Sequence, residues 1–138
     1  MRTNPLIKSA IEAVKQAHAP YSRFLVGAAL LTKEGTIFPG CNIEAGVPIG
    51  ICAERAALCN AVIHGEKQFL ELAIYTKTRT HTSPCGVCRQ MLSEFSRDLM
   101  IHSVNEKKEV VTWRLSDLLP YPFIAEEAGA YSRETGKK

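Results

Sequence analysis

The 138-residue chain has no long hydrophobic run and little net charge of either sign. No apolar stretch approaches the ~20 residues that a membrane-spanning helix needs, and residues 1–5 lack the apolar core of a secretory signal. The net charge of +3 is small and scattered, and the chain has a single tryptophan, so no nucleic-acid surface is indicated. We therefore expect neither a membrane nor a nucleic acid as a partner, and we expect a cytoplasmic protein.

Cysteines are few and odd in number. The five cysteines lack the spacing of a small secreted domain, so they do not indicate a disulfide framework. No internal repeat or linker interrupts the chain, whose 46% hydrophobic and 22% charged residues fit a globular protein. We expect a single domain over residues 1–138, with a core over 1–123 and a C-terminal tail over 124–138. The pattern does not distinguish a terminal helix from a frayed end in that tail.

Hydrophobic periodicity predicts strands that alternate with helices. A 3.6-residue repeat predicts a helix over residues 5–18, which Ala19-Pro20 ends. Two apolar runs predict a hairpin of strands over 24–31 and 36–43, followed by a loop over 44–51. The later expected elements are a helix over 52–64, a strand over 69–75, a loop over 76–83, a helix over 85–95, strands over 99–104 and 109–113, and a helical turn over 115–119. This alternation indicates an α/β fold, a three-layer α/β/α sandwich with a mixed sheet of about five strands.

Two short motifs carry thiols that are able to hold a metal ion: Cys52-Ala53-Glu54 and Pro84-Cys85-Gly86-Val87-Cys88. Each motif opens an expected helix, so two positive helix ends would meet at the thiolates. Three thiolates bind zinc and leave its fourth coordination position open, as catalytic zinc requires. Taken alone, the pair Cys85 and Cys88 also fits a redox thiol pair or half of a structural four-thiolate site.

The two remaining cysteines do not complete a structural site. Cys59 follows Cys52 by two helical turns, which places it about 10 Å away. Cys41 lies in a strand pattern, where a buried free cysteine is expected. The sequence therefore favours a three-thiol zinc site with an open position.

Cys-x-Glu followed later by Pro-Cys-x-x-Cys is the zinc-deaminase signature in its all-cysteine form, with a glutamate that is not a ligand. The flanking blocks continue in order over residues 20–123, as Pro20-Tyr21-Ser22-x-Phe24, Val26-Gly27-Ala28-Ala29-Leu30, Gly40-Cys41-Asn42-Ile43-Glu44, Gly50-Ile51-Cys52-Ala53-Glu54-Arg55, Pro84-Cys85-Gly86-x-Cys88-Arg89-Gln90 and Leu118-Leu119-Pro120. On these blocks the chain resembles the small homotetrameric cytidine deaminases that act on free nucleosides. The resemblance implies hydrolysis of cytidine or deoxycytidine to uridine or deoxyuridine with release of ammonia, in pyrimidine salvage. It also implies one Zn²⁺ per subunit and a homotetramer with shared active sites.

Residues around the thiols then take expected roles. Glu54 is the catalytic residue, which takes a proton from the attacking water, delivers it to N3 of the pyrimidine and then protonates the departing amine. Three thiolates leave zinc with a net charge of −1, which weakens its power to acidify water. Arg55 is expected to donate to the ligand thiolates and recover some of that power. An arginine on the helix surface is the alternative.

The resemblance implies five substrate-binding residues: Phe24, Asn42, Glu44, Ala53 and Phe123. Asn42 and Glu44 lie two apart at a strand end, so both point to one face and suit a ribose hydroxyl. By residue type alone they read as ordinary turn residues. Phe24 is expected to line the base pocket, and Phe123 to reach into a neighbouring subunit's site and pack on the base.

One loop departs from the family pattern. Relatives commonly carry Asn-Ala-x-Tyr after the glutamate, whereas residues 45–48 read Ala-Gly-Val-Pro, one residue shorter and without the amide and the aromatic hydroxyl. A modified cytidine or a blasticidin-S-like nucleoside is therefore an alternative substrate. A polynucleotide-editing deaminase would need more basic and aromatic groups, and a non-catalytic zinc-binding protein would not need Glu54.

Overall fold

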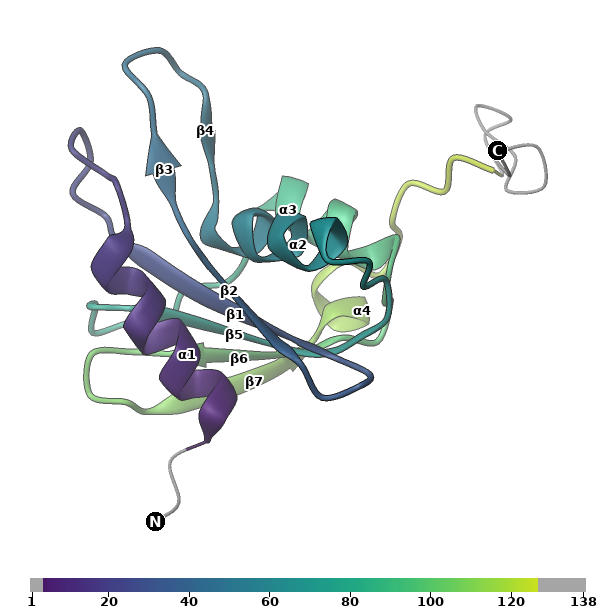
Figure 1. The fold of residues 1–138 in the computed structure, drawn as a ribbon. Helices are drawn as coiled ribbons and strands as arrows, with labels where there is room; N and C mark the ends of the chain where they lie inside the picture. The colour runs from purple at the N-terminus through teal and green to yellow at the C-terminus, as the bar shows by residue number, and fades with distance from the viewer. Residues whose placement is uncertain (1–3, 127–138) are drawn as a thin grey trace.

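The computed structural model describes residues 4–126, in which four consecutive strands are followed by strands that alternate with helices up to β6 (Met100–Val104) (Figure 1). The predicted tail lies almost entirely outside the described residues. In chain order the elements are α1 (Pro5–Ala13), a 3-10 turn η1 (Val14–Gln16), β1 (Val26–Thr32), β2 (Ile37–Cys41), β3 (Ile43–Glu44), β4 (Gly50–Ile51), α2 (Ala53–Ile63), β5 (Phe69–Thr76), α3 (Gly86–Ser93), β6 (Met100–Val104), β7 (Val110–Arg114) and α4 (Leu115–Leu118).

A five-stranded sheet forms the middle of three layers. Its strand order is β2-β1-β5-β6-β7, and β5 and β6 run parallel while the other neighbours run antiparallel. Helix α1 packs on one face, and α2 and α3 pack on the other (Figure 1). The predicted three-layer α/β/α sandwich with a mixed sheet is confirmed. Within residues 4–126, every helix is too short or too polar to cross a membrane.

Side chains of the central strands alternate between two hydrophobic cores. Ala28 and Leu30 of β1 belong to the core under α2 and α3, whereas Ala29 belongs to the core under α1. Strand β5 alternates in the same way, with Ile74 on one side and Ala73 on the other. Because both faces are covered, these strands are apolar at nearly every position, which explains the continuous apolar runs in the sequence.

Two glycines set how closely the helices approach the sheet. A Cβ atom at Gly27 of β1 would overlap the carbonyl oxygen of Ala10 in α1, and one at Gly40 of β2 would overlap the backbone nitrogen of Ala57 in α2. A side chain at either position would therefore push a helix off the sheet. Since Cys52 directly precedes α2, the contact at Gly40 also sets the height of that cysteine above the sheet.

The predicted helix over residues 5–18 is right at its start and wrong at its end. Asn4 caps α1, and its Oδ1 accepts a hydrogen bond from the backbone N–H of Leu6 at 2.9 Å. The chain turns to extended geometry at Ala17, and His18 forms a parallel bridge with Ile43. The backbone of His18 is paired with the strand region beside it, so the helix ends before the proline that the sequence offered as its stop.

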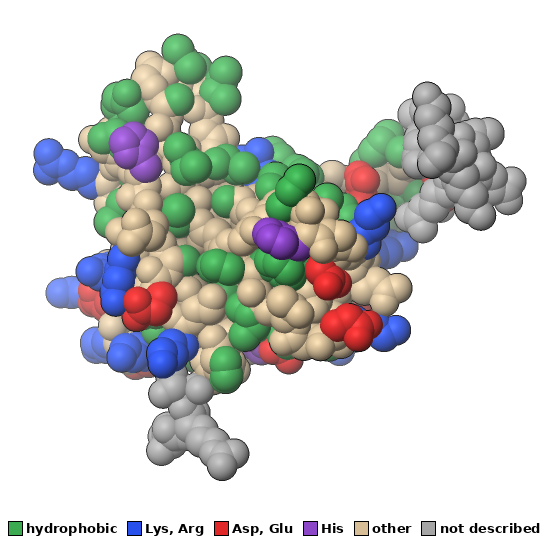
Figure 2. Space-filling model, in the orientation of Figure 1, with side chains coloured by type: hydrophobic (Ala, Val, Ile, Leu, Met, Phe, Trp, Pro, Cys, Tyr) green, Lys and Arg blue, Asp and Glu red, His purple; other side chains and the backbone are tan. Residues whose placement is uncertain are grey.

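The predicted loop over residues 44–51 is instead the end of a two-stranded ribbon. Strands β3 and β4 pair antiparallel, with Ile43 opposite Ile51 and Glu44 opposite Gly50. The ribbon projects from the body, and hydrophobic side chains gather at its tip (Figures 1 and 2). Ile49, near that tip, is 72% exposed. Strands of two residues are too short to leave an alternating pattern, and Gly46 and Pro48 concealed the pairing.

Candidate metal centre and active site

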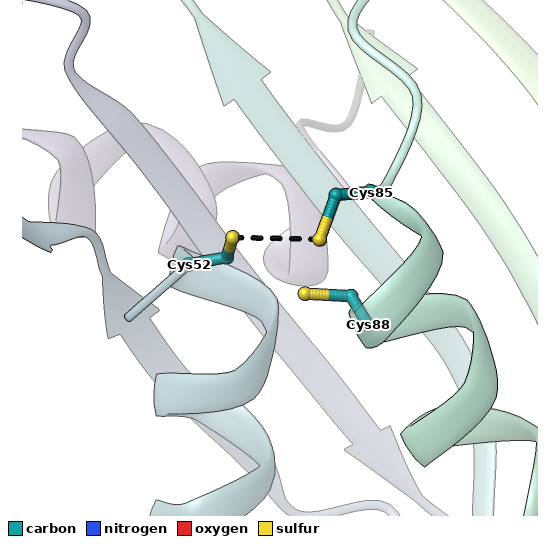
Figure 3. Close-up of side chains that lie close together, drawn as sticks. All are labelled: Cys52, Cys85 and Cys88. Carbon is teal, nitrogen blue, oxygen red and sulfur yellow. Dashed lines mark hydrogen bonds between the residues drawn. The ribbon is translucent and has the colours of Figure 1, made fainter. Parts of the chain in front are cut away.

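Three cysteine side chains meet at the N-terminal ends of two helices (Figure 3). Cys52 precedes α2, Cys85 precedes α3, and Cys88 lies in the first turn of α3. All three Sγ atoms lie within 4.8 Å of one another, and those of Cys52 and Cys85 are 3.6 Å apart. Tetrahedral zinc with Zn–S bonds of about 2.3 Å holds its sulfurs roughly 3.8 Å apart, so the cluster fits one ion. Thiolates are also the soft ligands that zinc accepts.

The protein around the thiols controls their ionisation. Burial raises the pKa of the Cys52 thiol and that of the Cys88 thiol. Burial also opposes ionisation of Cys85, but hydrogen bonds from the N–H groups of Cys88 and Val87 and from neighbouring thiols outweigh it and lower the pKa. Metal binding requires thiolates, so uptake of zinc releases protons here and tightens as the pH rises.

Arg55 places a positive charge against this cluster. Its Nη2 donates to Cys52 Sγ at 3.5 Å, and this bond, together with the nearby Cys88, raises the pKa of Arg55 above its ordinary value. The side chain is half-buried, and its buried Nε has no partner within residues 4–126. The structure thus gives Arg55 the position that its expected role requires; the role itself stays a prediction.

Glu54 is a buried carboxyl group beside the thiols. It lies in the first turn of α2 and is 4% exposed. Burial raises its pKa, and its own backbone N–H and Arg55 offset only part of that effect. A carboxyl group in such surroundings takes up and returns a proton more readily near neutral pH than an exposed one does.

A cavity of about 430 Å³ opens over Cys52, Glu54 and Cys85. Two of the predicted substrate residues, Asn42 and Glu44, line it, and so does Phe24. The other two do not. The Ala53 side chain is fully buried, and what Ala53 offers is a backbone N–H in the first turn of α2. Phe123 lies away from this cavity, with its side chain 60% exposed.

Asn42 and Glu44 already bind the segment that carries Phe24. Asn42 Oδ1 accepts from the N–H of Val26 at 2.9 Å, and its Nδ2 donates to the carbonyl of Phe24 at 2.7 Å. Glu44 Oε1 accepts from the N–H groups of Tyr21 and Ser22 at 3.2 and 3.1 Å. Hydrogen bonds from Ser22 lower the pKa of Glu44. Asn42 and Glu44 therefore hold the backbone of the segment that carries Phe24, and they also line the cavity themselves.

Sequence reasoning missed Thr82 and Ser83, which also line the cavity. The loop that carries them is held by Ser103 of β6, whose hydroxyl donates to the carbonyl of Thr82 at 2.8 Å. Arg89 of α3 holds the next part of the loop, since its Nε donates to the carbonyl of Pro84 at 2.8 Å. The available signal was two polar residues directly before Pro84-Cys85.

Known proteins match this chain over most of its length. Residues 2–103 match the family model described as "Cytidine and deoxycytidylate deaminase zinc-binding region". The cytidine deaminase of Sporosarcina psychrophila is 41% identical over 129 residues, which cover 92% of this chain and 95% of that one. The cytidine deaminase of Halalkalibacterium halodurans is 41% identical over 124 residues, covering 88% and 94%.

Solved structures agree with these relatives. The crystal structure of cytidine deaminase from Burkholderia pseudomallei has a TM-score of 0.84 and 38% identity, covering 89% of this chain and all of that one. The enzyme from Mycobacterium tuberculosis has a TM-score of 0.77 and 38% identity, covering 90% and 98%. The resemblance that the motifs indicated is confirmed, and with its three-cysteine zinc site the chain belongs to the cytidine deaminase family.

Proposed function

We propose that this chain hydrolyses the 4-amino group of free cytidine and deoxycytidine, which yields uridine or deoxyuridine and ammonia for pyrimidine salvage. Two relatives named cytidine deaminase are each 41% identical to it. The observation that carries the proposal is Glu54, a buried carboxyl group in the same cavity as Cys52 and Cys85. A structural zinc site needs no carboxyl group that transfers protons, whereas hydrolytic deamination does.

The residues of the site divide the chemistry between them. Zinc held by Cys52, Cys85 and Cys88 would keep one coordination position open and lower the pKa of water there. Glu54 accepts a proton from the attacking water and gives it to N3 of the pyrimidine as the oxygen bonds to C4. Glu54 then takes the second proton of the water from the new C4 hydroxyl and passes it to the 4-amino group, which departs as ammonia and leaves a carbonyl at C4. Arg55 offsets the negative charge of the thiolates throughout.

Charges around the cavity favour a nucleoside over its monophosphate. Phosphate sites in proteins use arginine, lysine or free N–H groups at helix N-termini. Among the described lining residues Arg55 is the one basic side chain, and it is bonded to Cys52. Glu44 adds a carboxylate whose lowered pKa keeps it ionised, so it would repel a phosphate. We therefore rank deoxycytidylate below the nucleosides.

A larger nucleoside is the second candidate. A smaller cavity of about 250 Å³ adjoins the first, with Glu44 and Gly50 lining both. Tyr21, Val47 and Ile49 give it an apolar wall. It would accommodate a substituent that cytidine lacks, as in a modified cytidine or a blasticidin-S-like nucleoside.

We further propose a homotetramer that shares its active sites and works in the cytoplasm. Large apolar side chains are exposed beside the cavity and on the C-terminal segment, as expected of surfaces that another subunit covers; they include Tyr21, Phe24, Ile43, Tyr121 and Phe123. The zinc ligands must stay reduced, and all five cysteines are free, which fits a thiol-reducing compartment.

Ultraviolet spectroscopy on a substrate panel tests the function. The panel holds cytidine, deoxycytidine, deoxycytidylate, cytosine, a blasticidin-type nucleoside and a cytosine oligonucleotide. We expect turnover of the first two and little of the others. Glu54→Gln should keep its zinc and lose about 10²- to 10⁴-fold in kcat. Turnover confined to deoxycytidylate or to the oligonucleotide would reject the proposal, and so would a Glu54→Gln enzyme of nearly full activity.

A further inference from the structure

The side chain of Gln90 holds the backbone of Phe123 with two hydrogen bonds. Gln90 Nε2 donates to the carbonyl oxygen of Phe123, and Gln90 Oε1 accepts from its N–H, both at 2.9 Å. An amide that donates to and accepts from the same residue fixes both the position and the orientation of that residue's backbone. Gln90 lies on α3, whose N-terminal end carries Cys85 and Cys88.

The segment that Gln90 holds turns its aromatic side chains outward. Phe123 is 60% exposed and Tyr121 is 92% exposed. Pro120 and Pro122 fix φ on either side of Tyr121, which further restricts the segment. A backbone held this firmly, with large apolar side chains facing outward, indicates a preformed contact surface.

A second copy of this chain offers the matching surface. Phe24, Leu25 and Ile43 are exposed large apolar residues at the edge of the cavity, and Phe24 and Ile43 line it. Phe123 does not line the cavity of its own subunit. An aromatic ring from another subunit would cover these apolar side chains and exclude water from the cavity.

We propose that Gln90 is a positioning residue that presents Phe123 to the cavity of a neighbouring copy of the chain. The inference rests on the proposed function, in which Phe123 packs on the base in a neighbouring active site. Each α3 helix then serves two sites: its N-terminal end binds the metal of one subunit, and Gln90 orients the aromatic ring that closes another. Gln90 also donates to Glu94 one turn along α3, but it reaches the substrate only through Phe123, so its loss should impair substrate binding and leave the metal in place.

Gln90→Leu removes both hydrogen bonds to Phe123, together with a longer one from Gln90 Nε2 to Glu94 Oε1 at 3.3 Å, at similar side-chain volume. We expect one zinc per chain, a kcat within about twofold of wild type and a KM for cytidine raised on the order of tenfold, the effect of two ordinary hydrogen bonds. Gln68→Leu makes the same chemical change at an exposed position and should alter neither constant.

In a double variant, Gln90→Leu should add nothing to the KM of Phe123→Ala, since both changes remove the same contact with the substrate. Effects that simply add would show that Gln90 acts elsewhere.

Mixed tetramers distinguish a contact between subunits from one within a subunit. Glu54→Gln subunits hold Phe123 through Gln90 but have no proton carrier, whereas Gln90→Leu subunits keep the proton carrier Glu54 but no longer hold Phe123 in place. Assembled together, they should show a new active population with the wild-type KM, because intact Phe123 reaches the active cavities. A KM that stays at the Gln90→Leu value in the mixture would overturn the proposal, as would an unchanged KM in Gln90→Leu itself. A wild-type protein that leaves cytidine unreacted would instead overturn the proposed function on which the inference rests.

Discussion

The floor and the rim of the cavity are built in opposite ways. The floor consists of Cys52, Glu54, Cys85 and Cys88 at the N-terminal ends of α2 and α3, and the rim consists of residues 21–24 and the β3–β4 ribbon. In the floor Cys88 and Glu54 are buried, Cys52 is half-buried and Cys85 is exposed, whereas the rim is exposed at nearly every position. We therefore propose that the floor carries the chemistry and that the rim sets which nucleoside is accepted.

Different forces hold the two regions. Helix α2, which positions half of the floor, packs against β2 so closely that Gly40 admits no side chain. The rim depends on polar contacts from Asn42 and Glu44 to the backbone of the neighbouring segment. Changes in the floor should therefore abolish the reaction, and changes in the rim should shift KM and local stability.

Cys88→Ala should break the floor and give the largest effect. With two thiolates left, the site should lose its zinc, and activity should fall at least roughly a thousandfold because zinc contributes several kcal/mol to the transition state. Metal analysis and cytidine turnover measure both losses. Cys59→Ala, at an exposed cysteine on α2, should keep one zinc per chain and full activity. Zinc retained at full stoichiometry in Cys88→Ala would contradict the three-thiol site.

Asn42→Ala should loosen the rim and leave the floor intact. It removes the bonds to Val26 and Phe24, so stability should fall by about 2 kcal/mol and KM should rise roughly tenfold with zinc unchanged. Denaturant unfolding and steady-state kinetics give the two values. Asn60→Ala, which removes one bond to the carbonyl of Pro39, is the control and should leave KM unaltered. Zinc loss in Asn42→Ala would show that rim and floor are not separable.

Glu44→Gln should have the smallest effect, and one that depends on pH. The folded-state pKa of Glu44 lies below its ordinary value of 4.5, chiefly because of hydrogen bonds from Ser22, so its stabilising effect is present above pH 4.5 and is lost as the pH falls through the folded-state pKa. Wild type should melt a little above Glu44→Gln at pH 7, and the difference should shrink below pH 4.5. Thermal unfolding across this range measures it. A Tm difference that stays constant with pH would mean that the charge of Glu44 stabilises nothing.

The sequence predicted the floor well because its signals are local. Each cysteine motif sits where a helix begins, and helix geometry brings Cys85 and Cys88 to one side. The layers were also predictable, since strands covered on both faces must be apolar throughout, as residues 26–31 nearly are. No local signal joins Cys52 to Cys85; their meeting was inferred because Cys41 and Cys59 do not complete a site, and the family resemblance then supported it.

The rim was predicted less well because long-range backbone pairing forms it. The bridge between His18 and Ile43 shortened the first helix, and the two-residue strands β3 and β4 left no pattern. Thr82 is held at the cavity by a hydrogen bond from Ser103, which lies 21 residues later in the chain. Nothing in the sequence pairs Gln90 with Phe123, 33 residues later, although Gln90 lay in a recognised block.

The thiol cluster joins parts of the chain that are 33 residues apart at Cys52 and Cys85. An ion bound by these thiols only in the folded state adds its binding free energy to folding. The same ion that activates water would therefore also hold α2 to α3, so loss of zinc would lower the stability of the folded protein as well as its activity.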